Sequence, residues 1–290
     1  MDAIAQIRRF NRTVTQEIGV LEERFLGRDR SLGASRLLFE IGANGMEIRQ
    51  LRARLNLDSG YASRLLRGLE AEGLLHTVRS SGDARVRHVT LTPAGRKELA
   101  LLNRRSDQAA GSLLRRLPEA QRPAFVAALG AVERLLLASA VRLRVENPRG
   151  RRAQYCLQRY FEELAARFER GYDPALGIPV AATEVTPPQG FFVVATLNGE
   201  PVGCGALKCH ADYGEIKRMW VAPASRGLGI GKRILQRLEA LARKRRVPLL
   251  RLETNKTLTE AQALYRSSGF GEVRPFNDEP YAHYWFEKAL

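Results

Sequence analysis

The sequence has 290 residues, of which 44% are hydrophobic and 27% charged, and its formal net charge is +16. This length suffices for two domains of ordinary size, and the composition excludes a disordered or fibrous chain. The charged N-terminus has no apolar signal segment and the apolar runs fall short of a membrane span, so we expect a cytoplasmic protein with no membrane partner.

Apolar residues at three- and four-residue steps predict one long amphipathic helix from Ile4 to Phe25. Further helices are expected at about 34–41, 47–55 and 59–72, with short turns between them. The last two of these helices form a helix-turn-helix.

The second helix of this pair has two kinds of face. Asp58 or Ser59 can cap its N-terminus, and the leucines at 65, 66 and 69 lie on a face that must be core. The outer faces carry small polar and basic residues: Ser59, Tyr61, Ala62, Ser63, Arg64 and Arg67. Short side chains permit approach to the major groove of DNA, and arginine can bond guanine. A basic face exposed to solvent without a ligand is the alternative.

The segments Thr77–Arg79 and Val86–Leu91 read as two strands around the polar turn 80–85, which makes a winged helix-turn-helix. Together with Leu91-Thr-Pro-Ala-Gly-Arg96, this pattern resembles the MarR family of regulators, whose wing commonly carries the Asp-x-Arg found here at Asp83 and Arg85. The resemblance implies that Arg85, with Arg87, reaches the minor groove of double-stranded DNA.

Two more helices are expected at about 94–117 and 119–142, broken at Pro118. The second carries apolar residues along one side: Phe125, Leu129, Val132, Leu135 and Leu136. With the first helix, they offer more apolar surface than a small winged domain can cover. In the MarR family these terminal helices make the dimer, so the resemblance implies a homodimer that reads a palindromic operator. We assign residues 1–140 to this DNA-binding and dimerisation domain.

The second half, residues 141–290, follows without a flexible linker. A strand at 141–145, a helix at 151–170, and a hairpin of 191–197 and 201–208 joined by Asn198-Gly199 are expected first. A strand ending at Val221, a helix at 230–246, a strand at 249–254 and a last hairpin near Val273 and Tyr284–Glu287 follow.

The cysteines in this half, Cys156, Cys204 and Cys209, are odd in number and contain no Cys-x-x-Cys pair. They indicate buried, reduced thiols instead of a disulfide framework. Cys209, His210 and Asp212 could be read as metal ligands, but a strand is expected to end there, and we expect no metal site.

The segment Ser225–Lys232, Ser-Arg-Gly-Leu-Gly-Ile-Gly-Lys, lies between a strand and a helix. Glycines at every second position let the backbone turn with its N–H groups inward, and the helix N-terminus adds the positive end of its dipole. A diphosphate fits such a turn. A Rossmann site is disfavoured, because Gly-x-Gly-x-x-Gly is absent and Asn255, not an acidic residue, follows the next strand.

The loop resembles the acetyl-CoA loop of the GNAT acyltransferases, whose pattern Arg/Gln-x-x-Gly-x-Gly is met by Arg226, Gly229 and Gly231. Residues Ala263–Phe270 match the second signature of that superfamily. The resemblance implies an α/β fold with a central mixed, mostly antiparallel sheet, and an N-acetyltransferase that transfers the acetyl group of acetyl-CoA to an amine, for which we expect a small molecule. The implied cofactor-binding residues are Met219, Trp220, Val221, Arg226, Gly227, Leu228, Gly229, Ile230, Gly231, Lys232 and Asn255.

Two candidate catalytic residues follow from the same resemblance. Tyr265 is a phenol that can protonate departing coenzyme A, and Glu215 stands where several members of the superfamily carry a carboxylate base. A core tyrosine and a surface ion pair are the structural alternatives. Glu253 is the other candidate base, and water can also take the amine proton.

The sequence thus predicts a bifunctional DNA-binding regulator and acetyltransferase. One alternative is a regulator whose second domain senses acetyl-CoA or a metabolite without turnover. Another is an enzyme whose winged domain is only a dimerisation scaffold, against which Arg64, Arg67, Arg85 and Arg87 argue.

Overall fold

The computed structural model describes residues 2–19, 25–79 and 86–290, which form two compact units, Met1–Leu129 and Gly130–Leu290. The division falls inside helix α6 (Arg122–Ala140), whose last residue is where the sequence suggests the domain boundary. Each unit has its own hydrophobic core.

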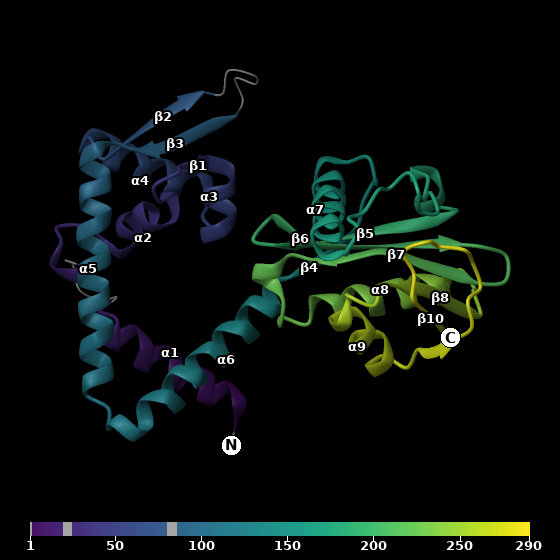
Figure 1. Ribbon diagram of the computed structural model, residues 1–290. Helices are drawn as coiled ribbons and strands as arrows, with labels where there is room; N and C mark the ends of the chain where they lie inside the picture. Colours follow the sequence, from purple (N-terminus) through teal and green to yellow (C-terminus); the bar gives the residue numbers. More distant parts are fainter. Residues whose placement is uncertain (1, 20–24, 80–85) are drawn as a thin grey trace. The chain divides into compact units, whose positions relative to one another are not determined.

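The first unit is mainly helical, as the sequence predicts (Figure 1). Its helices are α1 (Ala3–Glu17), α2 (Leu32–Ile41), α3 (Ile48–Leu55), α4 (Ser59–Ala71) and α5 (Pro93–Arg115), with short 3-10 turns at η1 (Phe25–Gly27) and η2 (Glu119–Gln121). The α3–α4 turn contains Asn56 in the left-handed conformation, which asparagine tolerates better than most residues. The expected helix-turn-helix is therefore present.

The first helix is shorter than its apolar pattern suggests. It ends at Glu17, and Gly19 follows with a φ of 65°, the left-handed conformation that commonly terminates a helix. Leu21 lies outside the described residues, and Phe25 belongs to η1. One continuous helix through Phe25 was thus a wrong prediction, because the glycine redirects the backbone.

A three-stranded antiparallel sheet completes the first unit, in the order β1-β3-β2. Its strands are β1 (Met46–Glu47), β2 (Leu75–Arg79) and β3 (Arg87–Leu91). The hairpin of β2 and β3 confirms the expected strands, whereas β1 is too short to leave a periodic signal. Helices and sheet share one core, which includes the fully buried Leu37, Leu51, Val89 and Leu102.

Helix α6 leaves most of its apolar side chains uncovered within the chain. Leu135 and Leu136 are 72% and 63% exposed, and Ile4 in α1 is 68% exposed. By length and composition, Glu119–Ala140 could cross a membrane, and no part of its apolar window is buried. This corrects the expectation that every apolar run is too short for a span, since the described residues contain one such helix.

The second unit is built on a seven-stranded sheet in the order β4-β5-β6-β7-β8-β10-β9. Its strands are β4 (Arg142–Val145), β5 (Gly190–Leu197), β6 (Glu200–Cys209), β7 (Gly214–Val221), β8 (Leu249–Thr254), β9 (Gly271–Val273) and β10 (Tyr284–Ala289). Neighbouring strands are antiparallel except β7 and β8, which are parallel. The predicted mixed, mostly antiparallel sheet is confirmed.

Three helices cover this sheet (Figure 1). Helix α7 (Arg151–Arg167) lies on one face, and α8 (Ile230–Lys244) and α9 (Thr259–Ser267) lie on the other. Buried Cys156 of α7 packs with Phe192 and Cys204 of the sheet, and Leu238 of α8 packs with Phe286. Because both faces of the central strands are covered, only the strand ends and the loops after them are free to form a site.

Candidate functional site

The glycine-rich loop joins η4 (Pro223–Ser225) to the first turn of α8. Gly227 and Gly229 have φ values of 80° and 70°, and a Cβ at either would meet no other atom within 4 Å. Glycine is therefore required by the backbone conformation and not by crowding. The loop and the α8 N-terminus together present backbone N–H groups, which suits an anionic group such as a pyrophosphate.

The loop borders a cavity of about 510 Å³, which we call the loop cavity. Nine of the predicted cofactor-binding residues border it: Met219, Trp220, Val221, Arg226, Gly227, Gly229, Ile230, Gly231 and Lys232. Leu228 is different, because its side chain is buried in the hydrophobic core, so only its backbone could face a ligand. The size and the backbone donors of the loop cavity fit a large phosphorylated cofactor.

Glu163 of α7 connects helix and loop at this cavity. Its carboxylate accepts two hydrogen bonds from Nη2 of Arg226, at 2.5 and 2.7 Å, and one from Nε1 of Trp220 at 3.0 Å. The Arg226 Nε also donates to the carbonyl of Val221 at 3.2 Å. Sequence analysis missed Glu163, since helical periodicity does not reveal which loop a helix face will meet.

Strands β7 and β8 pair over a short stretch only. Gly214 lies opposite Leu250 and Glu215 opposite Arg251, and the described residues of the two strands form no further pairs. The register between β6 and β7 shifts near Ala206, and Arg218 has a φ of 57°, so a bulge redirects β7 there. The two strands consequently diverge, and side chains from both border the space between them.

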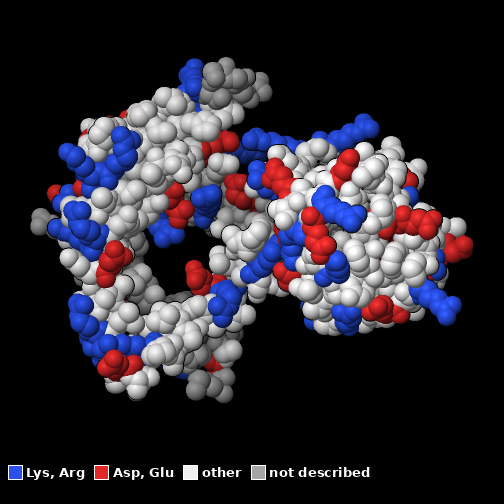
Figure 2. Space-filling model, in the orientation of Figure 1, with Lys and Arg blue, Asp and Glu red and all other residues white. Residues whose placement is uncertain are grey.

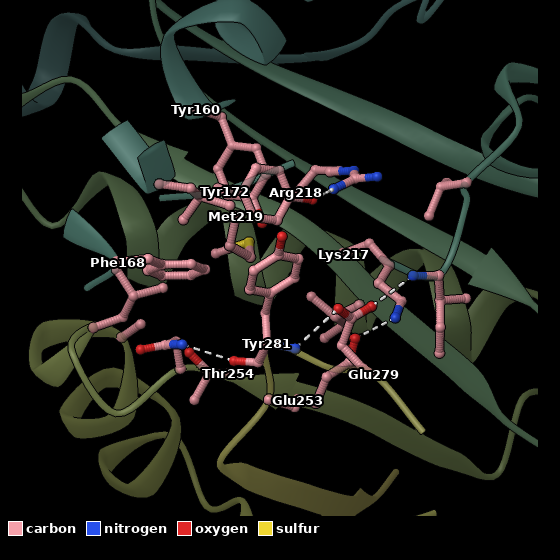
Figure 3. A pocket seen from close by; sticks show the side chains of 18 of the residues that line it. Tyr160, Phe168, Tyr172, Lys217, Arg218, Met219, Glu253, Thr254, Glu279 and Tyr281 are labelled. Atoms are coloured by element: carbon pink, nitrogen blue, oxygen red, sulfur yellow. Dashed lines mark hydrogen bonds and ion pairs between the residues drawn. The ribbon is translucent and has the colours of Figure 1, made fainter. Parts of the chain in front are cut away.

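This space holds a smaller cavity of about 90 Å³, which we call the inner cavity. Its aromatic wall contains Phe168, Tyr172 and Tyr281, and the rings of Tyr172 and Tyr281 are 4.7 Å apart between centroids (Figure 3). The residues that border both cavities are Tyr160, Leu164, Met219, Leu258, Ala261 and Tyr265. The two cavities therefore meet along these six residues, and Tyr265 is one of them.

Glu253 and Lys217 face each other at the inner cavity, where they form an ion pair (Figure 3). Burial raises the pKa of the Glu253 carboxyl, the Lys217 ammonium opposes this effect, and the pKa remains above its usual value. A carboxylate with a raised pKa is suited to accept a proton near neutral pH.

Glu215, the predicted base, is held in an ion pair with Lys217, and its role as base stays a prediction. Its carboxylate lies 2.9 Å from Nζ of Lys217 and 3.6 Å from Nε2 of His210, and it does not border the inner cavity. Glu253, the alternative base, borders this cavity, as does Glu279. The parallel register of β7 and β8 explains the difference, because Glu215 still lies within the paired stretch and Glu253 lies beyond it.

Tyr265 lies on α9 and is 5% exposed. Its ring packs against Phe270 and Phe286, each with a centroid separation of 6.0 Å. Burial raises the pKa of the Tyr265 phenol, so the group stays protonated at neutral pH and can donate a proton. Tyr265 borders both cavities, and its role as proton donor stays a prediction.

Asn255 borders the inner cavity and not the loop cavity. Its side-chain amide donates to the carbonyl of Tyr281 at 2.7 Å and accepts from the backbone N–H of Thr257 at 2.9 Å. The structure thus gives Asn255 a role in holding two loops together, and its predicted contact with the cofactor arm stays a prediction.

In the first unit, α4 presents the predicted DNA-binding side chains outward. The exposed residues are Ser59, Tyr61, Ser63, Arg64 and Arg67, whereas Ala62 is buried, contrary to expectation. Asp58 caps the helix by accepting from the backbone N–H of Tyr61 at 2.9 Å. Figure 2 shows groups of Lys and Arg side chains on the face of this unit that it draws.

The base of the wing carries two arginines in register. Arg79 of β2 lies directly opposite Arg87 of β3, and both are exposed. Asp83 and Arg85, the predicted wing tip, lie outside the described residues. Sequence analysis missed Arg79, since its relation to Arg87 depends on strand register.

Family comparisons match both units. The model of the acetyltransferase (GNAT) family matches residues 157–270, and that of the MarR family matches residues 27–86. An acetyltransferase of the GNAT family from Staphylococcus aureus is 18% identical, with a TM-score of 0.43, and the similarity covers 52% of this chain and 99% of that one.

Two of the curated relatives share sequence with part of this chain. An IAA acetyltransferase of Azospirillum brasilense is 45% identical over 87 residues, which are 29% of this chain and 57% of that protein. An uncharacterized N-acetyltransferase of Schizosaccharomyces pombe is 30% identical over 128 residues, which are 43% of this chain and 77% of that protein. The chain thus spans little more than half the length of the first relative.

Proposed function

Because the chain belongs to the GNAT family of acetyltransferases and carries a MarR family domain before it, we propose that it is a DNA-binding regulator that also transfers the acetyl group of acetyl-CoA to an amine. The observation that carries the catalytic part is the meeting of the loop cavity and the inner cavity at Tyr265. One cavity suits a phosphorylated cofactor, and the other suits a small acceptor beside a carboxylate.

The residues of the loop cavity fit acetyl-CoA. The N–H groups from Gly227 to Lys232 would hold its pyrophosphate, and the backbone of β7 from Met219 to Val221 would align its pantetheine arm. When bound, acetyl-CoA supplies an acetyl thioester at the junction of the two cavities. The left-handed Gly227 and Gly229 support this assignment, because a Cβ at either position would meet no other atom within 4 Å and this open space is left for a ligand.

The residues of the inner cavity then accept and donate the protons of the reaction. Glu253 takes the proton that an ammonium acceptor must lose, and Tyr265 donates one to the departing sulfur. Lys217 pairs with Glu253 and opposes the rise in its pKa that burial causes. The aromatic wall gives this reaction space one apolar side.

For the first unit we propose that α4 enters the major groove of double-stranded DNA and that the wing lies along the backbone or in the minor groove. The exposed Arg64 and Arg67 on a capped helix support this reading, as do Arg79 and Arg87. The uncovered apolar faces of α1 and α6 support a homodimer, which would present two α4 helices to a palindromic operator.

The experiment that tests the enzyme is incubation of the full-length chain with acetyl-CoA and a panel of amines, with free thiol as the readout. Thiol release that depends on an amine supports the proposal. Tight binding of acetyl-CoA without release for any amine would instead favour a sensor domain. Selection of bound duplexes from a random library tests the DNA-binding part, and recovery of a palindrome is the expected result.

A further inference from the structure

Arg218 is a cation at the inner cavity that no carboxylate balances. Its side chain is partly buried, and its Nη1 donates to the Tyr172 hydroxyl at 3.2 Å (Figure 3). Among the described residues, no Asp or Glu forms an ion pair with it. The neighbouring Lys217, by contrast, pairs with both Glu215 and Glu253. A guanidinium drawn partly out of water without a counter-ion is costly, and an anionic ligand would relieve that cost.

The backbone at Arg218 is strained, and this strained conformation sets the direction of the Arg218 side chain. Its φ of 57° is left-handed, a conformation that costs a non-glycine residue about 1–2 kcal/mol. The strain falls at the bulge opposite Cys204 and Ala206, where β7 would otherwise continue its regular alternation. Bulges next to active sites commonly redirect a side chain, and here the redirected side chain is the unbalanced cation.

Two aromatic rings hold the guanidinium on its faces. It lies 4.9 Å from the ring centroid of Phe161 and 5.7 Å from that of Tyr160. Such contacts stabilise an arginine plane and fix its orientation, so a ligand would share the edge of the guanidinium with the Tyr172 hydroxyl, to which Nη1 donates. A fixed guanidinium edge matches the two oxygens of a carboxylate.

A negatively charged group lies elsewhere in the same cavity. Glu253 provides a carboxylate there, and Tyr265 marks the junction with the loop cavity. The inner cavity thus combines an acidic group suited to an amine with a basic group suited to an anion. Its volume of about 90 Å³ suits a small molecule.

We propose that the acceptor is an amino acid, whose carboxylate binds Arg218 and whose amino group faces Glu253 and Tyr265. This inference rests on the proposed acetyltransferase function. The neutral amine nitrogen forms a bond to the acetyl carbon as the carbon–sulfur bond breaks. The nitrogen gives up one proton, the sulfur takes one, and the products are an N-acetyl amino acid and coenzyme A.

The test uses matched acceptors that differ only in the carboxylate: alanine against ethylamine, and phenylalanine against phenethylamine. Acetylation by the full-length chain is measured as thiol release, for wild type, Arg218→Gln and the control Arg237→Gln, which alters an exposed arginine of α8. In wild type we expect a lower KM for at least one amino acid than for its amine. Arg218→Gln should raise that KM by about 10- to 100-fold, as expected for a lost charged hydrogen bond.

The same substitution should leave the KM of the amines and the Kd of acetyl-CoA within about twofold, since neither involves Arg218. Arg218→Lys keeps the positive charge but not the forked guanidinium, so it should restore part of the affinity for the amino acid. Equal KM values for amino acids and amines in wild type would overturn the inference. A similar change for both acceptor classes in Arg218→Gln would do the same, because it would indicate general damage.

Failure of the acetyltransferase proposal can be distinguished from failure of the inference about the amino acid. If wild type released no thiol with any acceptor, calorimetric titration of amino acids into the chain loaded with coenzyme A would still report on Arg218. Binding by wild type that is lost in Arg218→Gln and kept in Arg237→Gln would support an amino acid site. No binding of any amino acid would contradict it.

Discussion

Arg79 and Arg87 lie directly opposite each other in the antiparallel pair of β2 and β3. Like charges at directly opposed positions disfavour a hairpin, so an anion nearby would stabilise this pair. The adjacent α4 carries Arg64 on its outer surface, where its guanidinium lies 5.8 Å from the ring centroid of Tyr61. A phosphate backbone along the wing would supply the missing negative charge.

We therefore expect Arg87→Ala to weaken binding to operator and random duplexes alike. It should also reduce the slope of the logarithm of the binding constant against the logarithm of the salt concentration by about one. Arg64→Ala should instead cost the operator about 1–3 kcal/mol and random DNA little, because a base contact discriminates. Binding isotherms at several salt concentrations measure both effects. Arg115→Ala, at the exposed end of α5, is the control, and unchanged affinities in both variants would refute this DNA-binding mode.

Gly229→Glu should abolish acetyl-CoA binding. The new side chain would adopt a strained left-handed backbone and place a negative charge in the phosphate site. Gly269→Glu is a matched control, since Gly269 has a φ of 85° and borders neither the loop cavity nor the inner cavity. Calorimetric titration with acetyl-CoA provides the measurement, and wild-type affinity in a folded Gly229→Glu protein would remove the assignment of the loop.

Tyr265→Phe should lower kcat by about 100- to 10,000-fold and leave the Kd of acetyl-CoA nearly unchanged. The substitution keeps the ring that packs against Phe270 and Phe286 but removes the proton donor. Rates of thiol release at saturating substrates test this, with Tyr284→Phe in β10 as the control. A loss of only two- or threefold, with chemistry rate-limiting, would mean that solvent protonates the thiolate.

Protonation of Glu253 should lower kcat/KM at acidic pH, which gives the pH profile an acid limb. Because its pKa is raised, the base form is lost as pH falls through a value above the usual range for a glutamate, and kcat/KM should fall with it. Glu253→Gln should remove this limb and lower the rate by about 100-fold, whereas Glu215→Gln should keep the limb. The opposite result, a limb lost in Glu215→Gln and kept in Glu253→Gln, would return the role of base to Glu215.

Leu135→Glu should convert a dimer into a monomer, because Leu135 is 72% exposed on the uncovered face of α6. Sedimentation velocity measures the change. Leu176→Glu is the control, since Leu176 is 67% exposed but lies outside α1 and α6. A monomeric wild type would contradict the dimer, and flotation of wild type with lipid vesicles would point to a membrane as the partner of α6.

The sequence by itself determined the features whose signals are local. Helical periodicity and a short polar turn are enough to predict the winged helix-turn-helix, and the pattern of Arg226, Gly229 and Gly231 before a helix indicates the cofactor loop. In both cases the residues that define the feature are close together in the chain, so no long-range contact is needed to recognise it.

Only the tertiary structure decided which side chains share a cavity. Glu253 and not Glu215 reaches the inner cavity, because β7 and β8 pair over their first residues and then diverge. Arg218 is turned toward Tyr172 by a bulge, and Glu163 meets Arg226 across a helix and a loop. Register, bulges and the divergence of strands arise from pairing between distant segments, and the alternation of residues in a single strand carries no record of them.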